Sequence, residues 1–117
     1  MEFKVQKLTT HQLKDRLKRE RPFMLVDIRE MEAFMKGHIP GASNMFDNET
    51  IARVKRISKG TDIILYGPGT QGQQKINDDA AEKFMNLGSM YVFSYEDGLK
   101  GWTDDGNKVD HSAQKMT

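Results

Sequence analysis

Hydrophobic and polar residues alternate along the chain in blocks that predict strands and helices in turn. Almost continuous apolar runs occur at 23–28 (FMLVDI), 61–66 (TDIILY) and 90–95 (MYVFSY), as expected for strands covered on both faces. A run at 3–8 (FKVQKL) predicts a short first strand, and the turn-rich stretch 38–45 (HIPGASNM) allows another near its end. Because segments with helical spacing lie between these runs, the pattern favours an α/β domain with a mainly parallel sheet.

The first two helices are predicted from capping residues and from apolar spacing. Thr9 and Gln12 have the spacing of a capping box, so a helix begins there and ends before Pro22. The segment 29–37 (REMEAFMKG) predicts a short second helix with a C-cap glycine. The residues expected on its buried face are Met31, Phe34 and Met35.

Further helices are predicted in the same way. Asp47 or Asn48 caps a helix that Gly60 ends, and its apolar side consists of Ile51, Val54 and Ile57. The segment 76–88 (INDDAAEKFMNLG) predicts a longer helix, and its apolar face consists of Ile76, Ala80, Phe84 and Leu87. The segment 98–102 (GLKGW) predicts a last short helix with Trp102 packed against the core.

Length and charge limit the organisation and the partners. The 117 residues fit one domain, expected at 1–106, followed by a polar, flexible C-terminal tail at 107–117. The formal net charge of +1 gives no strong field toward nucleic acid or membrane, and no apolar run approaches the roughly 20 residues of a membrane span. We therefore expect no nucleic-acid and no membrane partner, and we expect a monomer. The N-terminal residues contain no apolar stretch of signal-peptide length, which predicts a cytoplasmic protein, although a mature periplasmic chain would look the same.

The loop after the strand 61–66 reads GPGTQGQQ, and its glycines at 67, 69 and 72 have the spacing G-x-G-x-x-G. In a dinucleotide-binding fold this motif belongs to the first strand–helix unit, whereas here it comes late and Pro68 stiffens the turn. A dinucleotide site is therefore the weaker interpretation. A loop between the carboxyl end of a parallel strand and a helix N-terminus can also hold an anion through its backbone amides.

The stretch 25–45 (LVDIREMEAFMKGHIPGASNM) resembles the rhodanese homology domain. That family has a strand ending in Asp-x-Arg, a short helix with an acidic start and then Gly-His-Ile-Pro-Gly-Ala, which correspond here to 27–29 and 37–42. A second block at 80–102 has the family's Ala-Ala helix, strand and tryptophan, with Asp97-Gly98 where Gly-Gly is usual. The resemblance covers about residues 7–102. It implies a rhodanese-like three-layer α/β/α fold with a five-stranded, mainly parallel sheet.

The activity that the resemblance implies does not fit this chain. Members of the family transfer sulfane sulfur, and related phosphatases hydrolyse phosphate esters, through a cysteine that opens the loop after the fourth strand. That position falls here at Gly67 or Thr70, the chain contains no cysteine, and nothing between Tyr66 and Gln74 is charged. We therefore expect a catalytically inactive rhodanese-like domain that is a binding or regulatory module. The expected residues of its active loop, which could bind an anion, are Gly67, Gly69, Thr70, Gln71, Gly72 and Gln73.

The resemblance also indicates three supporting residues. Asp27, at the end of its strand, is expected to cap or brace the backbone and is a candidate base. Arg29 is expected to pair with a helix carboxylate, and His38 to hold its turn. No residue is assigned as catalytic, and we expect no cofactor and no metal.

Two alternatives stay open. The chain is an enzyme of altered chemistry, related to the sulfurtransferases or phosphatases and using Thr70 or Asp27, or it is an engineered cysteine-free form of an active rhodanese. For the inactive domain, the expected ligand is a protein partner or a small oxyanion.

Overall fold

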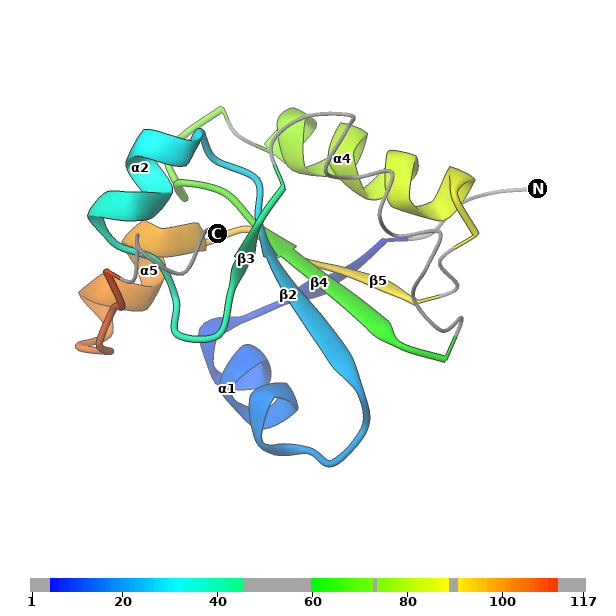
Figure 1. Ribbon diagram of the computed structural model, residues 1–117, viewed down its shortest axis with the longest axis horizontal. Helices are drawn as coiled ribbons and strands as arrows, with labels where there is room; N and C mark the ends of the chain where they lie inside the picture. The colour runs from blue at the N-terminus through cyan, green and yellow to red at the C-terminus, as the bar shows by residue number, and fades with distance from the viewer. Residues whose placement is uncertain (1–4, 46–59, 73, 89–90, 112–117) are drawn as a thin grey trace.

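A computed structural model describes residues 5–45, 60–72, 74–88 and 91–111. Its centre is a five-stranded sheet with the order β1-β5-β4-β2-β3, in which every neighbouring pair of strands is parallel (Figure 1). The strands are β1 (Gln6–Leu8), β2 (Phe23–Asp27), β3 (Ser43–Asn44), β4 (Asp62–Tyr66) and β5 (Val92–Tyr95). The predicted α/β fold with a five-stranded parallel sheet is therefore confirmed.

Helices cover both faces of this sheet. They are α1 (Thr10–Lys18), α2 (Met31–Lys36), α4 (Gln74–Asn86) and α5 (Gly98–Asp104). One core cluster joins the sheet to α1 and α5, with the buried side chains Leu13, Leu25, Ile64, Tyr95 and Trp102 among its members. A second cluster joins the opposite face to α4 and includes Val26, Leu65, Ala81, Phe84 and Val92. The sheet is thus the middle of three layers, and the helix predicted after Asp47 or Asn48 lies outside the described residues.

The strands end in a common row. The residue pairs of the register align Leu8, Tyr95, Tyr66, Asp27 and Asn44 across the whole sheet. The loops that follow these residues therefore meet at one edge, where ligands bind in parallel α/β sheets.

The capping box predicted for the first helix is present. The Thr9 hydroxyl oxygen accepts a hydrogen bond from the backbone of Gln12 at 3.1 Å, and the Gln12 side chain accepts one from the backbone of Thr9 at 2.8 Å. Both bonds satisfy N–H groups that a helix start leaves without an internal partner. Helix α1 is thereby held at the end of β1.

The buried face of α4 differs from the predicted one. The fully buried side chains are Asn77, Ala81 and Phe84, whereas Ile76 is 52% exposed. The prediction placed the helix by its largest apolar residues, but packing places Asn77 rather than Ile76 one turn before Ala81. Ala80 and Leu87 pack at the margin of the same cluster.

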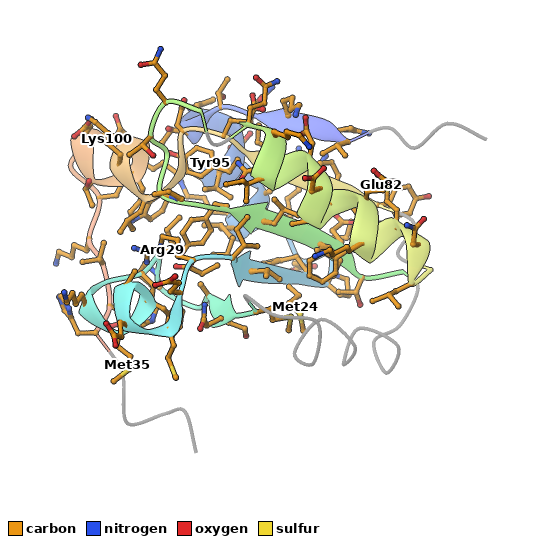
Figure 2. All side chains as sticks on the ribbon, turned by 90° about the horizontal axis from the view of Figure 1, so that it is seen from above. Met24, Arg29, Met35, Glu82, Tyr95 and Lys100 are labelled. Carbon is orange, nitrogen blue, oxygen red and sulfur yellow. The ribbon has the colours of Figure 1, made fainter. Side chains whose placement is uncertain are left out.

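The predicted buried face of α2 also included residues that the structure leaves exposed. Phe34 is buried, but Met31 and Met35 are 43% and 39% exposed. A helix of six residues presents little more than one side chain to the core, so the methionines remain at the surface. Figure 2 shows Met35 projecting from the outer side of α2.

The first residues of the predicted C-terminal tail form contacts with the domain. The backbone groups of His38 and Asp110 exchange two hydrogen bonds, of 3.0 and 2.8 Å, and the Trp102 indole donates to the carbonyl of Lys108 at 2.7 Å. Val109 packs at the edge of the core. Polar composition alone did not reveal these backbone contacts, and residues 112–117 lie outside the described part of the chain.

Candidate functional site

The glycine loop leaves β4, a central strand, and leads into α4 at the carboxyl edge of the sheet (Figure 1). Gly67 is buried, whereas Thr70 and Gln71 are exposed. Gly69 and Gly72 have φ values of 81° and 89°, a backbone region that favours glycine. The chain therefore makes two turns here that other residues would resist.

The loop contributes backbone N–H groups to the carboxyl edge of the sheet. Within the described residues, the N–H groups from 69 to 72 donate no hydrogen bond. They lie just ahead of α4, whose N-terminus carries the positive end of a helix dipole. In proteins generally, backbone N–H groups ahead of a helix N-terminus are able to hold anions. Gln73, also predicted for the site, lies outside the described residues.

The carbonyl groups of the same loop cap helix α5. The backbone N–H of Leu99 donates to Gly67 at 2.9 Å and that of Lys100 donates to Pro68 at 3.0 Å. The N-cap residue Asp97 forms no side-chain capping bond, so the loop satisfies first-turn amides of α5. The start of the loop is thereby attached to the turn between β5 and α5.

Asn77 reaches from α4 to the first residue of the loop. A Cβ atom placed on Gly67 would lie 3.1 Å from Asn77 Oδ1 and 3.8 Å from the nearest side-chain carbon of Ile28. Asn77 is 1% exposed, and its Oδ1 atom has no hydrogen-bond partner among the described residues. Sequence analysis missed this residue, because an asparagine near a helix start is ordinarily a surface or capping residue.

Asp27 and Arg29 form a buried ion pair at the end of β2. Arg29 Nε and Nη2 donate to Asp27 Oδ2 at 3.1 and 2.7 Å, and the Arg29 backbone N–H donates to Asp27 Oδ1 at 2.8 Å. Arg29 Nη2 also donates to the carbonyl of Gly37 at the end of α2, and Figure 2 shows the arginine beside that helix. The predicted helix carboxylate is thus the wrong partner, because the fully buried Asp27 carboxylate lies closer and needs a counter-charge.

His38 is buried in the turn that follows α2. Its ring stacks on Phe34 with 3.8 Å between the ring centroids, and its Nδ1 atom lies 2.8 Å from the carbonyl oxygen of Phe34. The backbone of His38 pairs with Asp110. These contacts attach the turn to α2 and to the C-terminal segment.

Tyr66 connects the turn to the sheet. Its hydroxyl oxygen accepts a hydrogen bond from the backbone N–H of Ile39 at 3.0 Å. Burial, reinforced by the negative charge of Asp27, raises the pKa of Tyr66 well above its usual range. The phenol therefore stays neutral and serves as a structural link rather than as an acid or base near neutral pH.

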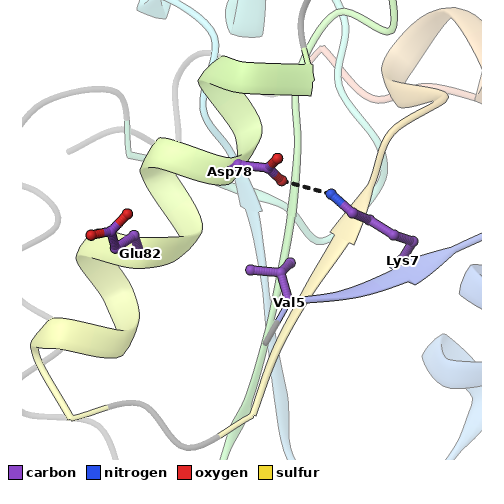
Figure 3. A pocket seen from close by; sticks show the side chains of 4 residues that line it. All are labelled: Val5, Lys7, Asp78 and Glu82. Carbon is purple, nitrogen blue, oxygen red and sulfur yellow. Dashed lines mark hydrogen bonds and ion pairs between the residues drawn. The ribbon is translucent and has the colours of Figure 1, made fainter. Parts of the chain in front are cut away.

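A polar surface pocket of about 280 Å³ lies between β1 and α4 (Figure 3). Its lining residues are Val5, Lys7, Asp78 and Glu82. Lys7 Nζ donates to Asp78 at 2.6 Å and to Glu96 at 2.9 Å, and these bonds outweigh burial and raise the pKa of Lys7. The partners lie 71 and 89 residues away in sequence, so no local pattern could have indicated the cluster.

The described ranges contain no group of three or more His, Asp or Glu side chains arranged to hold a metal ion. None of the helices in these ranges is long and apolar enough to cross a lipid bilayer.

The fold and the site define an α/β domain with a glycine loop at the carboxyl end of a central parallel strand. The family model described as a Rhodanese-like domain matches residues 9–105. The chain belongs to this family. The resemblance drawn from residues 25–45 and 80–102 is therefore confirmed, as is the variant without cysteine.

Two curated relatives match part of their length. The uncharacterized protein YibN of Escherichia coli K12 is 31% identical over 86 residues, which cover 70% of this chain and 57% of YibN. The HTH-type transcriptional regulator Rv0324 of Mycobacterium tuberculosis is 30% identical over 89 residues, which cover 76% of this chain and 38% of the regulator. This chain therefore spans little more than half of one relative and less than half of the other.

Among solved structures, the rhodanese-like domain of the Alr3790 protein from Anabaena sp. superposes with a TM-score of 0.77 at 26% identity. The match covers 98% of this chain and 85% of that domain. The sheet and helix arrangement is thus shared over nearly the whole length.

Proposed function

We propose that this rhodanese-like domain does not carry sulfur and acts as a binding and regulatory module whose glycine loop holds a small oxyanion. The observation that carries the proposal is at Gly67, where a reactive side chain would begin. Gly67 has no side chain, and a Cβ atom added there would lie 3.1 Å from Asn77 Oδ1. Persulfide chemistry needs a thiolate, which this chain cannot supply.

The backbone supports an anion more than a covalent intermediate. The N–H groups from 69 to 72 donate no hydrogen bond within the described residues, and they precede the N-terminus of α4. Such groups bind oxyanions through dipoles without any charged side chain. Because the site lacks a cation, we expect weak binding that responds to ligand concentration, as suits a regulatory contact.

The alternative of an enzyme with altered chemistry finds less support. The Asp27 carboxylate is fully buried and is occupied by Arg29, so it is no free base. Thr70 is exposed and has no hydrogen bond to a basic side chain in the described ranges. A hydroxyl without a base is a poor nucleophile.

The alternative of an engineered cysteine-free rhodanese finds little support as well. A cysteine restored at Gly67 would begin 3.1 Å from the buried Asn77 oxygen, which is tighter than an ordinary carbon contact. A single engineered replacement of cysteine by glycine would not explain why the Asn77 side chain lies so close to this position. Thr70, the other candidate position, is exposed.

A protein partner is the other proposed ligand. Large apolar side chains are exposed on the two helices that begin near the loop, namely Met31, Met35 and Ile76. We also propose the cytoplasm as the location of the protein, which cell fractionation would test.

Two experiments test the proposal. Purified protein should show no thiosulfate:cyanide sulfur transfer and no phosphatase activity above a heat-denatured control. In NMR titrations, sulfate, thiosulfate or phosphate should shift the backbone amide signals of residues 69–72, while signals of β1 stay in place. Robust turnover would overturn the inactive assignment, and an unchanged loop spectrum would overturn the anion-binding role.

A further inference from the structure

Strand β1 lies at one edge of the sheet, because the strand order begins with β1 and its residues pair only with β5. The backbone groups of residues 6–8 form no hydrogen bond outside that pairing within the described ranges. An edge strand presents its outward N–H and C=O groups to solvent, where an extended chain can pair with them. Gln6 and Lys7 are exposed, which indicates that the described residues leave this edge open.

The pocket between β1 and α4 lies beside this edge (Figure 3). Val5 and Lys7 line it from the β1 side, because alternate residues of an extended chain point to the same face. Its volume of about 280 Å³ is below the roughly 300–1,000 Å³ of small-molecule sites, so it suits one long side chain better than a free cofactor. Since β1 has only three residues, a chain paired with it needs such an anchor.

The pocket and its immediate surroundings carry more negative than positive charge. Asp78 and Glu82 lie one turn apart on α4, and both line the pocket. Lys7 Nζ donates to Asp78 and to Glu96, and Figure 3 shows Lys7 reaching from β1 to Asp78. Glu82 has no ion-pair partner among the described residues. One ammonium group against three carboxylates leaves a net charge of −2.

A lysine or arginine side chain complements this lining. Its cationic end would supply a positive charge near Glu82, and its aliphatic stem would lie against Val5. In a sheet, neighbouring residues of paired strands point to the same face, so a residue of an added strand beside Val5 would point toward α4. A carboxylate side chain at that position would instead meet like charges.

We propose that the free edge of β1 and the adjacent pocket form a docking site for an extended segment of a partner protein, with a lysine or arginine of that segment in the pocket. Backbone pairing along residues 5–8 aligns the segment, and Asp78 and Glu82 select the basic side chain. The site shares no residue with the glycine loop, so its test is independent of the proposed oxyanion binding.

The test is an NMR titration of the unaltered protein with the blocked pentapeptide TVKVT, in parallel with TVEVT, in which glutamate replaces the lysine. TVKVT should shift the backbone amide signals of residues 5–8 and 78–82 and leave those of residues 69–72 in place. TVEVT should shift none of them. A higher salt concentration should weaken the binding of TVKVT, because exposed charges are screened.

Variants at the pocket should change the affinity in opposite directions. Glu82→Gln should weaken the binding of TVKVT about two- to fivefold, which is the effect of one exposed ion pair. Lys7→Met should strengthen it by a similar factor, because the variant removes a competing cation and frees Asp78. Glu32→Gln is the matched control, since it makes the same change at an exposed position of α2 and should leave the affinity unchanged.

Each contrary result would overturn the proposal. Equal shifts with TVKVT and TVEVT, or equal affinities of Glu82→Gln and Glu32→Gln, would show that the pocket does not select a basic side chain. Signals of residues 5–8 that respond to neither peptide would show that the edge accepts no added strand. Shifts of residues 5–8 that grow with protein concentration in the absence of peptide would show that a second copy of the chain occupies the edge.

Discussion

Gly69 and Gly98 lie backbone to backbone where the glycine loop meets the turn into α5. A Cβ atom on Gly98 would lie 2.7 Å from the Cα atom of Gly69, and one on Gly69 would overlap the carbonyl of Asp97. Both glycines have positive φ, 81° at Gly69 and 58° at Gly98. This contact explains why position 98 is a glycine. The family usually has two consecutive glycines where this chain has Asp97-Gly98.

Gly69→Ala and Gly98→Ala should each destabilise the protein by about 3 kcal/mol or more, because a methyl group would meet backbone atoms in a left-handed conformation. Gly72→Ala is the control, since it shares the positive φ but has open space around it. It should cost only the conformational penalty of about 1–2 kcal/mol. Urea unfolding measures all three, and equal losses would contradict the close contact.

Replacing Arg29 with methionine should destabilise the fold by about 3–5 kcal/mol, because the Asp27 carboxylate would stay buried without its partner. Arg29→Lys should recover little, since an ammonium group cannot reproduce the fork that contacts Asp27 and Gly37. Lys75→Met, which breaks an exposed pair with Asp79, should leave the unfolding midpoint unchanged. If Arg29→Met lowers the free energy of unfolding by less than about 1 kcal/mol, the Arg29–Asp27 pair does not stabilise the fold.

Stability should fall as the pH rises above about 10, where an unfolded tyrosine begins to ionise. Burial raises the pKa of Tyr66, so above that pH the unfolded state loses a proton that the native state keeps. Below it both states are protonated, and the stabilising contribution is complete. The free energy of unfolding of Tyr66→Phe should therefore fall less between about pH 8 and 10.5 than that of the unaltered protein. Part of the fall that remains in the variant should come from Tyr95, because burial also raises the pKa of that residue.

Tyr66→Phe should also lower the stability at neutral pH. It leaves the Ile39 N–H without its acceptor, which should cost about 1–3 kcal/mol. Urea unfolding at both pH values separates the two effects. An identical pH slope in Tyr66→Phe and in the unaltered protein would contradict a buried neutral phenol at position 66.

Gly67→Cys should not create a sulfurtransferase. The new thiol would be buried beside the unpaired Asn77 oxygen, and both burial and that oxygen disfavour a thiolate. Thr70→Cys offers an exposed thiol for comparison. We expect iodoacetamide to alkylate position 70 much faster than position 67 at neutral pH, and substantial thiosulfate turnover by Gly67→Cys would refute this explanation.

Ser94→Ala should be neutral or should stabilise the protein by up to about 1 kcal/mol. The Ser94 hydroxyl is fully buried on β5 and has no partner in the described ranges, so its removal loses no bond. Ser43→Ala, at an exposed position of β3, is the control for the change of residue type. A loss of more than 1 kcal/mol in thermal unfolding would show that the hydroxyl has a partner.

The sheet could be predicted because its strands are buried on both faces. The mostly apolar run at 62–66 has the length and composition of a strand buried on both faces, whereas the register of its pairing with β2 is known only from the structure. The Asp-x-Arg and Gly-His-Ile-Pro-Gly-Ala motifs were recognised by their resemblance to the rhodanese homology domain, which did not reveal the contacts that their side chains form. Arg29 and Asp27 are two residues apart, and His38 contacts Phe34 four residues before it.

The candidate site was less accessible to sequence reasoning because its decisive contacts are long-range. Asn77 meets Gly67 across ten residues whose loop geometry no pattern specifies, and the carbonyls at 67 and 68 meet amides more than thirty residues later. Helix faces were predicted from apolar residues alone, so Ile76 was placed inside and Asn77 was overlooked. A buried polar residue breaks that pattern, and function can be the reason.

The capping of α5 by loop carbonyls has an experimental consequence. If a ligand turns the peptide groups at 67 and 68, the first-turn amides of α5 lose their acceptors, and the disturbance reaches Trp102 one turn later in that helix. Trp102 is the only tryptophan of the chain, and its indole is hydrogen-bonded to the carbonyl of Lys108. Its intrinsic fluorescence should consequently report movement of the loop in the unlabelled protein.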